Sequence, residues 1–464
     1  MPLHDAKPPG PRNLPFVGNT FLVRANPLGT LERWAREYGD VIYYRFFDAR
    51  VYILSHPQDI EQVLLGKSKN FVKGMTSRAN PELFGNGLLT SDGEFWRRQR
   101  RLANPAFHRE SINRYAEITL EEGRRVLARW QDGEVRDVHR DMMNATLRIV
   151  LRSLFGVELG ERGRIIERAL DVIMQSASGF NAVLSYLHLP TPLRRRYFRA
   201  VRELDGVVYE LVALGRERME RGSAAPGGPH DLLTMLLMAR DDDGNAMTDQ
   251  QLRDEVITLL LAGHETTALN LSWAWYLLAL HPDIEQRVHA ELDGVLGDQM
   301  PRPEHLTKLP YTDGVLREAL RLYPPAWRIW RTPTESFQAR EFVLPAGVNV
   351  VLSQWLTHRD ARWFPEPERF HPDRWTEECA AKLPRFAFFP FGGGPRVCIG
   401  AGFATMEATL LLATIAQRYR LRLAPGHCVE PLASITLRPK HGVHVELQVR
   451  RAASLPAQKI ATNA

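Results

Sequence analysis

The segment FGGGPRVCIG, residues 391–400, contains Cys398, one of three cysteines in the chain. Three consecutive glycines and Arg396 precede this cysteine, and a segment with helical apolar spacing follows it. A phosphate-binding loop fits poorly, because the segment has no lysine and lacks the glycine spacing of nucleotide-binding loops. A nucleophilic thiol is conceivable at the start of a helix, whose dipole lowers the pKa of a thiol. However, no histidine that could act as its base accompanies the motif.

A third interpretation makes Cys398 a thiolate bound axially to haem iron. Glycines let a backbone approach a flat macrocycle, and N–H groups directed at the sulfur temper the charge of the thiolate. The segment alone leaves the nucleophile and the haem ligand open, so other segments must decide between them.

The segment AGHETT, residues 262–267, places an acid and an alcohol, Glu265 and Thr266, within a long apolar run. Gly263 costs a helix interior about 1 kcal/mol relative to alanine, and a threonine hydroxyl can bond to a carbonyl of the preceding turn. One interpretation is a kink or a satisfied polar spot in a buried helix. The other is a groove in which the acid and the alcohol move protons.

The segment FWRRQRR, residues 95–101, places Trp96 and Arg100 four residues apart, on one face of a helix. An indole N–H and a guanidinium are both donors, so this face could hold a carboxylate. A solvated basic helix is the alternative. Arg331 and Arg396 are further candidates for binding the same anion.

The segment EALR sets Glu318 and Arg321 three residues apart on a helix, where an ion pair forms easily. In isolation this is an ordinary surface pair. The segment PERF brings Arg369 about fifty residues later. A buried Glu318 with both arginines would be a structural clamp, because a desolvated carboxylate needs compensation.

The elements that must position these residues are mostly helices. Residues 41–46 and 51–55 predict two paired strands, and residues from about 95 to 300 show mainly helical periodicity. Thr248 and Gln251 predict a capping box that opens one helix running to His281, about 50 Å long. After residue 335 short strands return. We therefore expect a mainly α fold with a smaller β component, to which about residues 1–65 and 335–450 contribute.

Composition sets the broad class of the protein. The chain has 464 residues, 44% hydrophobic and 25% charged, as expected for a globular protein with a large core. A net charge of +6 is modest and does not indicate nucleic acid. Three unpaired-looking cysteines and no apolar N-terminal run predict a cytoplasmic protein without a membrane anchor. Residues 256–280 could span a bilayer by length, but Glu265 near their middle favours a buried helix.

In order and spacing, the segments WRRQR, AGHETT, EALR, PERF and FGGGPRVCIG resemble the cytochrome P-450 family of haem-thiolate monooxygenases. The resemblance runs from PPGPRNLPFVGN near the start to ITLRPKHGV near the end. It implies a single haem domain over residues 1–464, with 451–464 as a tail, and a monomer. It also implies haem b, dioxygen, and electrons from NAD(P)H through an external ferredoxin or flavodoxin and its reductase.

The resemblance assigns a role to each motif residue. Cys398 would be the iron ligand, restrained by Phe391 and flanked by Gly392 and Gly400. Trp96, Arg100, Arg331 and Arg396 would bind the haem propionates, and Glu318, Arg321 and Arg369 would form the clamp. Glu265 and Thr266 would deliver protons to iron-bound dioxygen; peroxide-driven relatives commonly carry an arginine–proline arrangement instead. Arg97, Arg98, Arg101 and Arg396 would attract an acidic redox partner, with solubilising charge as the alternative.

The substrate is the least specified part of this interpretation. Family topology would line the pocket with the following residues: Leu83, Phe84, Leu88, Phe180, Ala262, Ala326, Trp327 and Ile435. These imply a hydrophobic substrate, such as a fatty acid, a terpenoid or a carotenoid. Residues 182–201 pair an apolar tip with a basic run, which suggests a lid that touches a lipid surface or a solvent-exposed loop. The alternative function is a haem-thiolate protein that binds or isomerises a hydrophobic ligand without net oxygenation.

Overall fold

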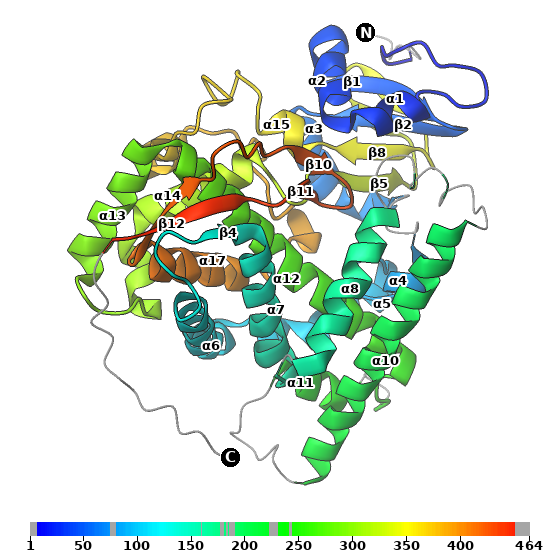
Figure 1. The fold of residues 1–464 in the computed structure, drawn as a ribbon. Helices are drawn as coiled ribbons and strands as arrows, with labels where there is room; N and C mark the ends of the chain where they lie inside the picture. Colours follow the sequence, from blue (N-terminus) through cyan, green and yellow to red (C-terminus); the bar gives the residue numbers. More distant parts are fainter. Residues whose placement is uncertain are drawn as a thin grey trace.

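Helices dominate the computed structural model, which describes residues 7–74, 80–158, 160–176, 181, 184, 191–221, 231–240 and 244–450 (Figure 1). The α-helices of this part are α1 (Thr20–Ala25), α2 (Pro27–Tyr38), α3 (Pro57–Glu61), α4 (Pro81–Phe84), α5 (Gly93–Ala103), α6 (Arg109–Leu127), α7 (Val138–Phe155), α8 (Gly160–Ser176), α10 (Pro192–Glu220), α11 (Leu232–Met238), α12 (Asp249–Leu280), α13 (Pro282–Leu296), α14 (Pro310–Leu322), α15 (Gln354–Thr357), α16 (Glu377–Ala381) and α17 (Ala401–Ala416). The mainly α fold expected from the sequence is confirmed.

Short strands form a smaller β component. They are β1 (Val41–Phe46), β2 (Ala49–Leu54), β3 (Phe71–Lys73), β4 (Val135–Asp137), β5 (Ile329–Pro333), β6 (Phe337–Ala339), β7 (Phe342–Leu344), β8 (Asn349–Leu352), β9 (Tyr419–Leu423), β10 (Pro431–Ala433), β11 (Leu437–Pro439) and β12 (His444–Val449). A five-stranded sheet of order β1-β2-β8-β5-β3 combines strands from the two chain ends, as expected. In Figure 1 this sheet lies beside α1 and α2.

One strand lies inside the region that periodicity marks as helical. The three residues of β4 pair with β12, in the sheet of order β4-β12-β9. A three-residue strand is too short to show alternation in a sequence. It forms because it pairs with β12, which lies near the C-terminal end of the chain.

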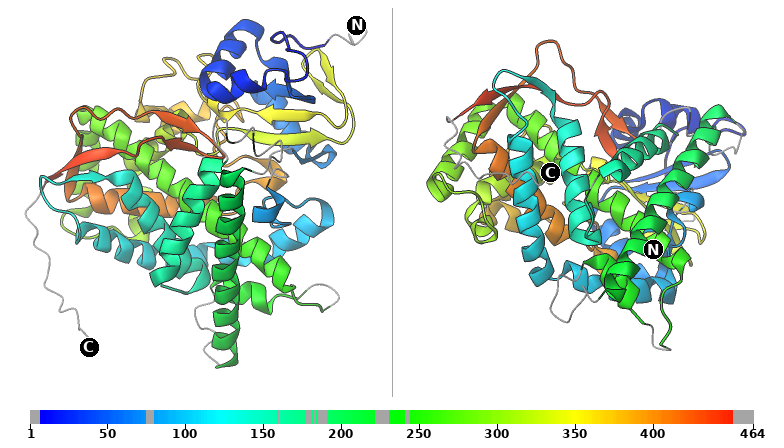
Figure 2. Two further views of the ribbon diagram at one scale, coloured as in Figure 1. Left: turned by 45° about the vertical axis from the view of Figure 1, so that its right-hand side comes forward. Right: turned by 60° about the horizontal axis from the view of Figure 1, so that its bottom comes forward.

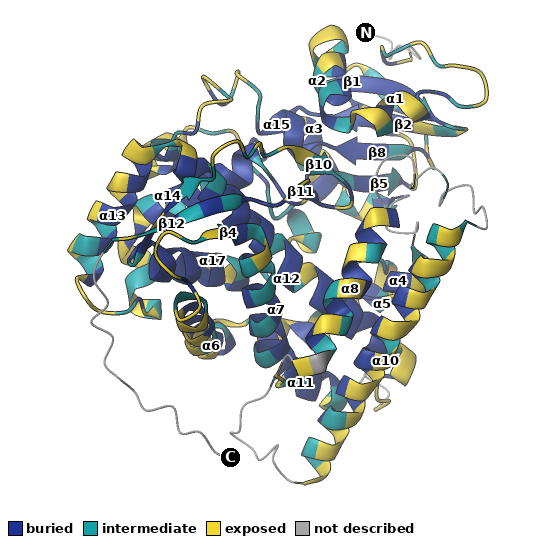
Figure 3. Ribbon diagram, viewed as in Figure 1, coloured by how far each residue is buried: buried dark blue, intermediate teal, exposed yellow. Residues whose placement is uncertain are grey.

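The long helix α12 has the limits that the sequence predicts. The Thr248 hydroxyl accepts the Gln251 N–H at 3.2 Å, and the Gln251 side chain accepts the Thr248 N–H at 2.8 Å, which completes the capping box. The helix ends at Leu280, before His281 and Pro282. Most of its residues are buried (Figure 3), so its apolar character reflects a position inside the protein. No helix among the described residues is long and apolar enough to cross a membrane.

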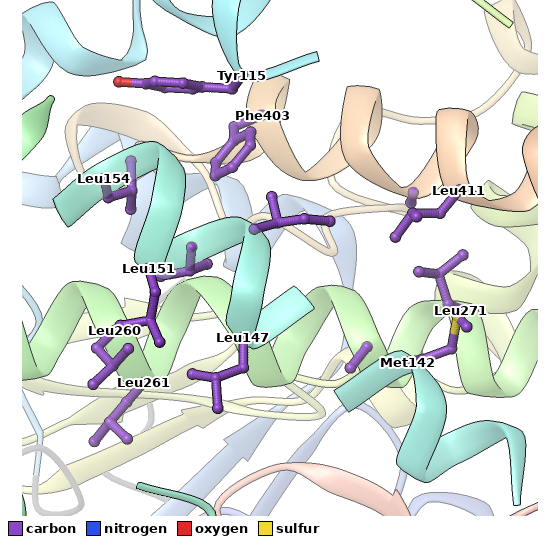
Figure 4. Close-up of a cluster of buried hydrophobic side chains, with 14 of the residues drawn as sticks. Tyr115, Met142, Leu147, Leu151, Leu154, Leu260, Leu261, Leu271, Phe403 and Leu411 are labelled. Atoms are coloured by element: carbon purple, nitrogen blue, oxygen red, sulfur yellow. The ribbon is translucent and has the colours of Figure 1, made fainter. Parts of the chain in front are cut away.

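The main core surrounds α12. Helix α7 packs along α12, with Leu147 and Leu151 of α7 facing Leu260 and Leu261 of α12, and α17 contacts α12 directly (Figure 4). Helices α8 and α10 pack on each other, and α10 also contacts α12 (Figure 2). Because α12 is packed on several sides, the polar residues in its middle are held in a rigid setting.

Some segments singled out from the sequence fall outside the described residues. These are Phe180, most of the proposed lid tip in 182–190, the loop at 222–230, and the tail 451–464. The basic run of the lid is described and belongs to the first turns of α10, which begins at Pro192.

Candidate active site

The Cys398 loop is closed by its own backbone. The Cys398 N–H donates to the Phe391 carbonyl at 2.9 Å, and Gly400, the residue before α17, directs its N–H at the thiol. Burial raises the pKa of the Cys398 thiol, and the Gly400 N–H and the Arg100 charge oppose that rise. The side chain is nevertheless accessible to water. The thiol is therefore both partly desolvated and reachable, as a cofactor ligand must be.

The glycines ahead of Cys398 are required mainly by protein contacts. Gly392 and Gly394 have φ of 71° and 65°, which L side chains rarely adopt. A Cβ on Gly394 would lie 1.8 Å from the Leu64 carbonyl oxygen, and one on Gly393 would lie 2.2 Å from the Phe386 ring. The sequence suggested clearance for a macrocycle. Instead, the missing side chain of Gly393 makes room for the Phe386 ring, and that of Gly394 makes room for the helical turn at Leu64.

Three cations converge near this loop. Lys73 of β3 and Arg331 of β5 are direct partners across the two strands, an arrangement of like charges that destabilises a sheet. Burial, then Arg331 and Arg396, lower the pKa of Lys73 well below its ordinary value. Burial and Arg396 likewise lower the pKa of Arg331 to about 10. Asp92 accepts from Arg396 at 2.6 Å, so one carboxylate offsets part of this charge.

The indole of Trp96 lies beneath this cationic cluster. It is buried, and the Arg396 guanidinium lies 4.2 Å from its ring centre. Arg100, one turn further along α5, donates to the Val397 carbonyl at 2.9 Å and so lies beside Cys398. The sequence-predicted residues Trp96, Arg100, Arg331 and Arg396 are therefore brought together. Lys73 was missed, because nothing in its local sequence distinguishes it from a surface lysine.

This cluster fits a dianionic cofactor. Buried cations that repel one another across a strand pair are stabilised when an anion lies between them. Two carboxylates on one flat molecule would meet that need, and the accessible thiol of Cys398 lies on the loop that also carries Arg396. The donor set of a single thiolate and several cations matches a haem with two propionates.

On α12, one face is open where the rest of the helix is covered. Ala262 is exposed and Thr266, one turn later, is partly exposed, although the helix around them is buried. The Thr266 hydroxyl donates to the Ala262 carbonyl at 2.7 Å. Gly263 faces α7, where a Cβ would lie 3.1 Å from Val150. The glycine thus allows close helix packing, and the accessible face from Ala262 to Thr266 next to it forms a notch in the helix.

Glu265 is held by the C-terminal strands. Its carboxylate is 5% exposed and accepts from Arg438 at 2.6 Å and from the Thr436 hydroxyl at 2.8 Å. Sequence reasoning placed Glu265 on the oxygen side of the haem without these partners. Ile435, a candidate pocket residue, lies in the turn between β10 and β11. Glu265 is therefore hydrogen-bonded to the same segment that carries Ile435.

A second buried acid joins the helix after Cys398 to α12. Glu407 of α17 is fully buried, and burial raises its pKa well above the usual range, with Thr267 as a hydrogen-bonding neighbour. The Glu407 carboxyl lies beside Thr267, so it connects α17 to the turn of α12 that contains Thr266. The sequence analysis did not identify it.

The predicted clamp exists with a different third member. Glu318 and Arg321 are both fully buried, with Nη2 to Oε1 at 2.8 Å and Nε to Oε2 at 2.9 Å. Arg369 contributes only its main-chain carbonyl, which accepts from Arg321 at 3.1 Å. Its guanidinium binds Glu366, and both side chains are exposed. The side-chain role expected for Arg369 is therefore wrong.

Arg374 takes that role. Its Nε donates to Glu318 at 3.3 Å, and the neighbouring Trp375 indole donates to Glu318 at 3.0 Å. The sequence contained a signal for it, since HPDRW repeats the proline–acid–arginine–aromatic order of PERF five residues later. Of these two segments, the chain folds only the second, with Arg374 and Trp375, against Glu318 of α14.

The candidate pocket residues divide by exposure. Ala262, Ala326 and Ile435 are exposed, and Leu88 is 8% exposed. Leu83, Phe84 and Trp327 lie in the buried cores, where the Trp327 indole donates to the Ser434 carbonyl at 3.1 Å. Trp327 thus supports the β10–β11 turn from behind. Phe180 lies outside the described residues.

A thiol loop, a cationic cluster that fits a dianion and an open face on the central helix are the features expected of a haem-thiolate monooxygenase. The chain belongs to the cytochrome P-450 family, whose family model, "Cytochrome P450", matches residues 8–445. The alternative of a ligand-binding protein without oxygenation is set aside, because named relatives are oxygenases. Members of the family use haem iron, dioxygen and electrons from redox partners.

Several relatives resemble the chain over most of its length. Cyclooctatin synthase of Streptomyces melanosporofaciens is 37% identical over 431 residues, 92% of each protein. Cyclooctat-9-en-7-ol 5-monooxygenase of the same organism is 37% identical, covering 90% of each. Pentalenene oxygenase of Streptomyces avermitilis is 34% identical, over 95% of this chain and 97% of the relative. The solved structure of a retinoic acid-bound cyanobacterial CYP120A1 matches with a TM-score of 0.85, at 28% identity, covering 95% and 99% of the two chains.

Proposed function

We propose that Cys398 is the axial ligand of haem b in a single haem domain, and that this monooxygenase hydroxylates a terpenoid. Lys73, Arg331 and Arg396 would hold the two propionates, with the Trp96 indole N–H as a further donor. The observation that carries the cofactor assignment is a pair of like charges, half-buried Lys73 and buried Arg331, placed directly opposite each other beside an accessible thiol loop. A bound anion would offset the repulsion that Asp92 leaves uncompensated in this cluster.

The test of the ligand is spectroscopic. The reduced protein should give the red-shifted carbon monoxide difference band of a thiolate-bound haem, and Cys398→Ala should lose it. Cys428→Ala is the matched control, because Cys428 is also a free and exposed cysteine. Persistence of the band in Cys398→Ala would refute the assignment. Loss of the band in both variants would point to misfolding rather than to ligation.

When bound, the haem supplies the activation of dioxygen, one atom of which enters a C–H bond of the substrate. The chain contributes the protons that this chemistry requires. The Thr266 hydroxyl, now donating to the Ala262 carbonyl, can accept a bond from a proton donor on the open face of α12. Glu265 can relay a proton taken up from solvent if its carboxylate exchanges the Arg438 contact for a donor in the notch. As long as the ion pair with Arg438 is intact, the Glu265 carboxylate stays out of the notch.

A coupling measurement tests this proton route. Thr266→Ala should divert reducing equivalents to hydrogen peroxide, while Thr266→Ser, which keeps the hydroxyl, should restore product formation. The amounts of NAD(P)H oxidised, product formed and peroxide released are measured together. Unchanged coupling in Thr266→Ala would remove the hydroxyl from the route.

The substrate class rests on the pocket and on the relatives. The open positions Ala262, Ala326 and Ile435 are apolar, and small side chains at two of them leave room for a bulky ring system. Relatives named for cyclooctat-9-en-7-ol and pentalenene oxidation act on cyclic terpenoids. We expect cyclic terpenes and terpene alcohols to induce the haem spectral shift that follows substrate binding, and fatty acids to bind more weakly. Equal or tighter binding of fatty acids would move the proposal to that class.

Electrons would reach the haem from an acidic ferredoxin or flavodoxin docked over α5, beside Arg97, Arg98 and Arg101. Arg97 and Arg101 are exposed, Arg97 is paired with Glu94, and α5 lies next to the Cys398 loop through Arg100. Fixed positive charge accelerates the encounter with an acidic partner. The protein would act as a cytoplasmic monomer.

A further inference from the structure

The N-terminal segment presents an unusual amount of apolar surface. Leu14, Phe16, Phe21 and Leu22 are 58%, 90%, 49% and 42% exposed, and they lie within nine residues of one another. We refer to these four side chains as the N-terminal apolar tip. Single exposed apolar residues are ordinary on a protein surface, but a group of large ones marks an interaction site. The exposed stretches of the N-terminal loop and α1 are visible at the upper right of Figure 3.

Phe16 occupies the apex of a strained turn. The Val17 N–H donates to the Pro15 carbonyl at 2.7 Å, and Phe16 between them has φ of 60°, which is the pattern of a γ-turn with the uncommon sign. A bulky residue adopts this region at a cost, and a phenyl ring exposed to water gains nothing to offset it. The turn therefore holds an apolar side chain outward at the expense of stability.

The segments around the turn are fixed to the sheet. The Arg45 N–H donates to the Asn13 side chain at 2.7 Å, and the Asn19 N–H donates to the Arg45 carbonyl at 2.7 Å. Leu14 and Gly18 form an isolated β-bridge, and Gly18 forms another with Phe46 of β1. The apolar tip is consequently presented by a rigid base, so little entropy is lost when it binds something.

Positive charge accompanies the tip. Residues 7–31 contain Lys7, Arg12 and Arg24 and no acidic residue. Arg12 is exposed, Arg45 is half-buried beside Gly18, and no carboxylate of the described residues is paired with either. The excess of positive charge therefore favours a partner that combines an apolar interior with negative charge at its boundary.

We propose that the N-terminal apolar tip docks the protein on a lipid bilayer that contains anionic phospholipids. Phe16 and the two leucines would enter the boundary between headgroups and acyl chains, and Arg12 and Arg45 would contact lipid phosphates. A second copy of the chain is disfavoured, because both copies carry +6 and would meet through like-charged surfaces. A projecting tip also suits a deformable lipid surface better than the flat complementary face of a protein partner. This inference does not depend on the proposed substrate.

Vesicle flotation of the haem-loaded protein tests the proposal. The protein is mixed with vesicles of phosphatidylcholine alone, or of phosphatidylcholine and phosphatidylglycerol in about equal parts. We expect binding to the anionic vesicles, at least about tenfold tighter than to neutral ones, and weaker binding at high salt. Phe16→Ser with Phe21→Ser should weaken binding at least about tenfold. Arg12→Glu should reduce only the preference for anionic vesicles.

Controls separate the proposal from general stickiness and from misfolding. Val135→Ser with Leu280→Ser changes two side chains that are 55% and 45% exposed on other elements, and should leave binding unchanged. The carbon monoxide difference band of each variant reports folding, and size-exclusion chromatography reports self-association. No binding to either vesicle, equal loss in the control variant, or a dimer that the tip variant dissociates would each overturn the proposal. Because flotation does not involve turnover, failure here leaves the monooxygenase assignment intact.

Discussion

The exchange of Arg369 for Arg374 in the clamp leads to a sharp prediction. Glu318 is fully buried and accepts hydrogen bonds from Arg321, Arg374, Trp375 and the His371 backbone. Arg374→Ala removes the bond to Glu318 and a second bond, at 2.9 Å, from its Nη2 to the Glu366 carbonyl. A hydrogen bond to a buried charge contributes about 1.5–3 kcal/mol and a neutral one about 1 kcal/mol. The free energy of unfolding should therefore fall by about 2.5–4 kcal/mol.

Arg369→Ala provides the matched comparison. Its guanidinium pairs with Glu366 at the surface, where such pairs contribute about 0–1 kcal/mol, and the carbonyl that Arg321 uses remains in the variant. We expect a loss below about 1 kcal/mol. Arg374→Lys should recover little of the loss in Arg374→Ala, because an ammonium cannot reproduce the two directed N–H bonds of the guanidinium.

Guanidinium chloride unfolding of the haem-loaded variants, followed by circular dichroism and by the haem absorbance, measures both effects. The clamp lies under the segment that leads to the Cys398 loop, so Arg374→Ala should also release haem at a lower denaturant concentration than Arg369→Ala. Equal losses in the two alanine variants, or a larger loss in Arg369→Ala, would refute the clamp described here.

Three further predictions concern other buried or charged groups. Arg438→Leu leaves the Glu265 carboxylate buried without its cation, and should cost about 2–3 kcal/mol in urea unfolding and increase peroxide release; unchanged values for both would show that the pair is dispensable. Burial, together with nearby arginines, lowers the pKa of His289 to about 3, so below pH ~6.5 the unfolded chain binds a proton that the folded chain excludes. Stability is therefore lost as pH falls, by roughly 2 kcal/mol at pH 5, and His289→Gln should remove that loss when unfolding at pH 7 and pH 5 is compared. Arg101→Glu should slow electron transfer from an acidic ferredoxin at low salt, whereas Arg202→Glu, an exposed change on α10, should not; equal slowing in stopped-flow measurements would place the docking surface elsewhere.

Local signals were sufficient for several elements of the fold. The capping box at Thr248 and the proline after His281 bounded α12 correctly, because both act within one helical turn. The β-branched and aromatic residues of 41–46 and 51–55 identified β1 and β2 for the same reason. The three-residue strands β3 and β4 were not identifiable, since their partners are more than two hundred and fifty residues away in sequence.

The clamp shows where a motif stops being informative. Two similar segments, PERF and HPDRW, both offered an arginine at a workable distance from Glu318 in sequence. Only the path of the chain after α14 determines which guanidinium reaches the buried carboxylate. Arg369 ends at the surface and Arg374 is 11% exposed beside Glu318.

The partners of the candidate site were likewise a property of the folded chain. Lys73 and Arg331 become neighbours through β3–β5 pairing, and Glu265 meets Arg438 through the return of β11 to α12. The residues adjacent to Lys73 and Arg438 in the sequence do not indicate either contact. Neither contact can be found without the long-range pairing.

By itself the sequence determined the chemistry: a cysteine loop, an acid–alcohol pair and a set of basic residues in an order that identifies the family. Residue types and short spacings carry that information, because capping, helical faces and loop glycines depend on neighbouring residues. Only the tertiary structure decided which charges compensate one another, because electrostatic compensation in a desolvated interior depends on distance in space. The Glu265–Arg438 pair, the cluster of Lys73, Arg331 and Arg396, and the Arg374 clamp all belong to that second kind.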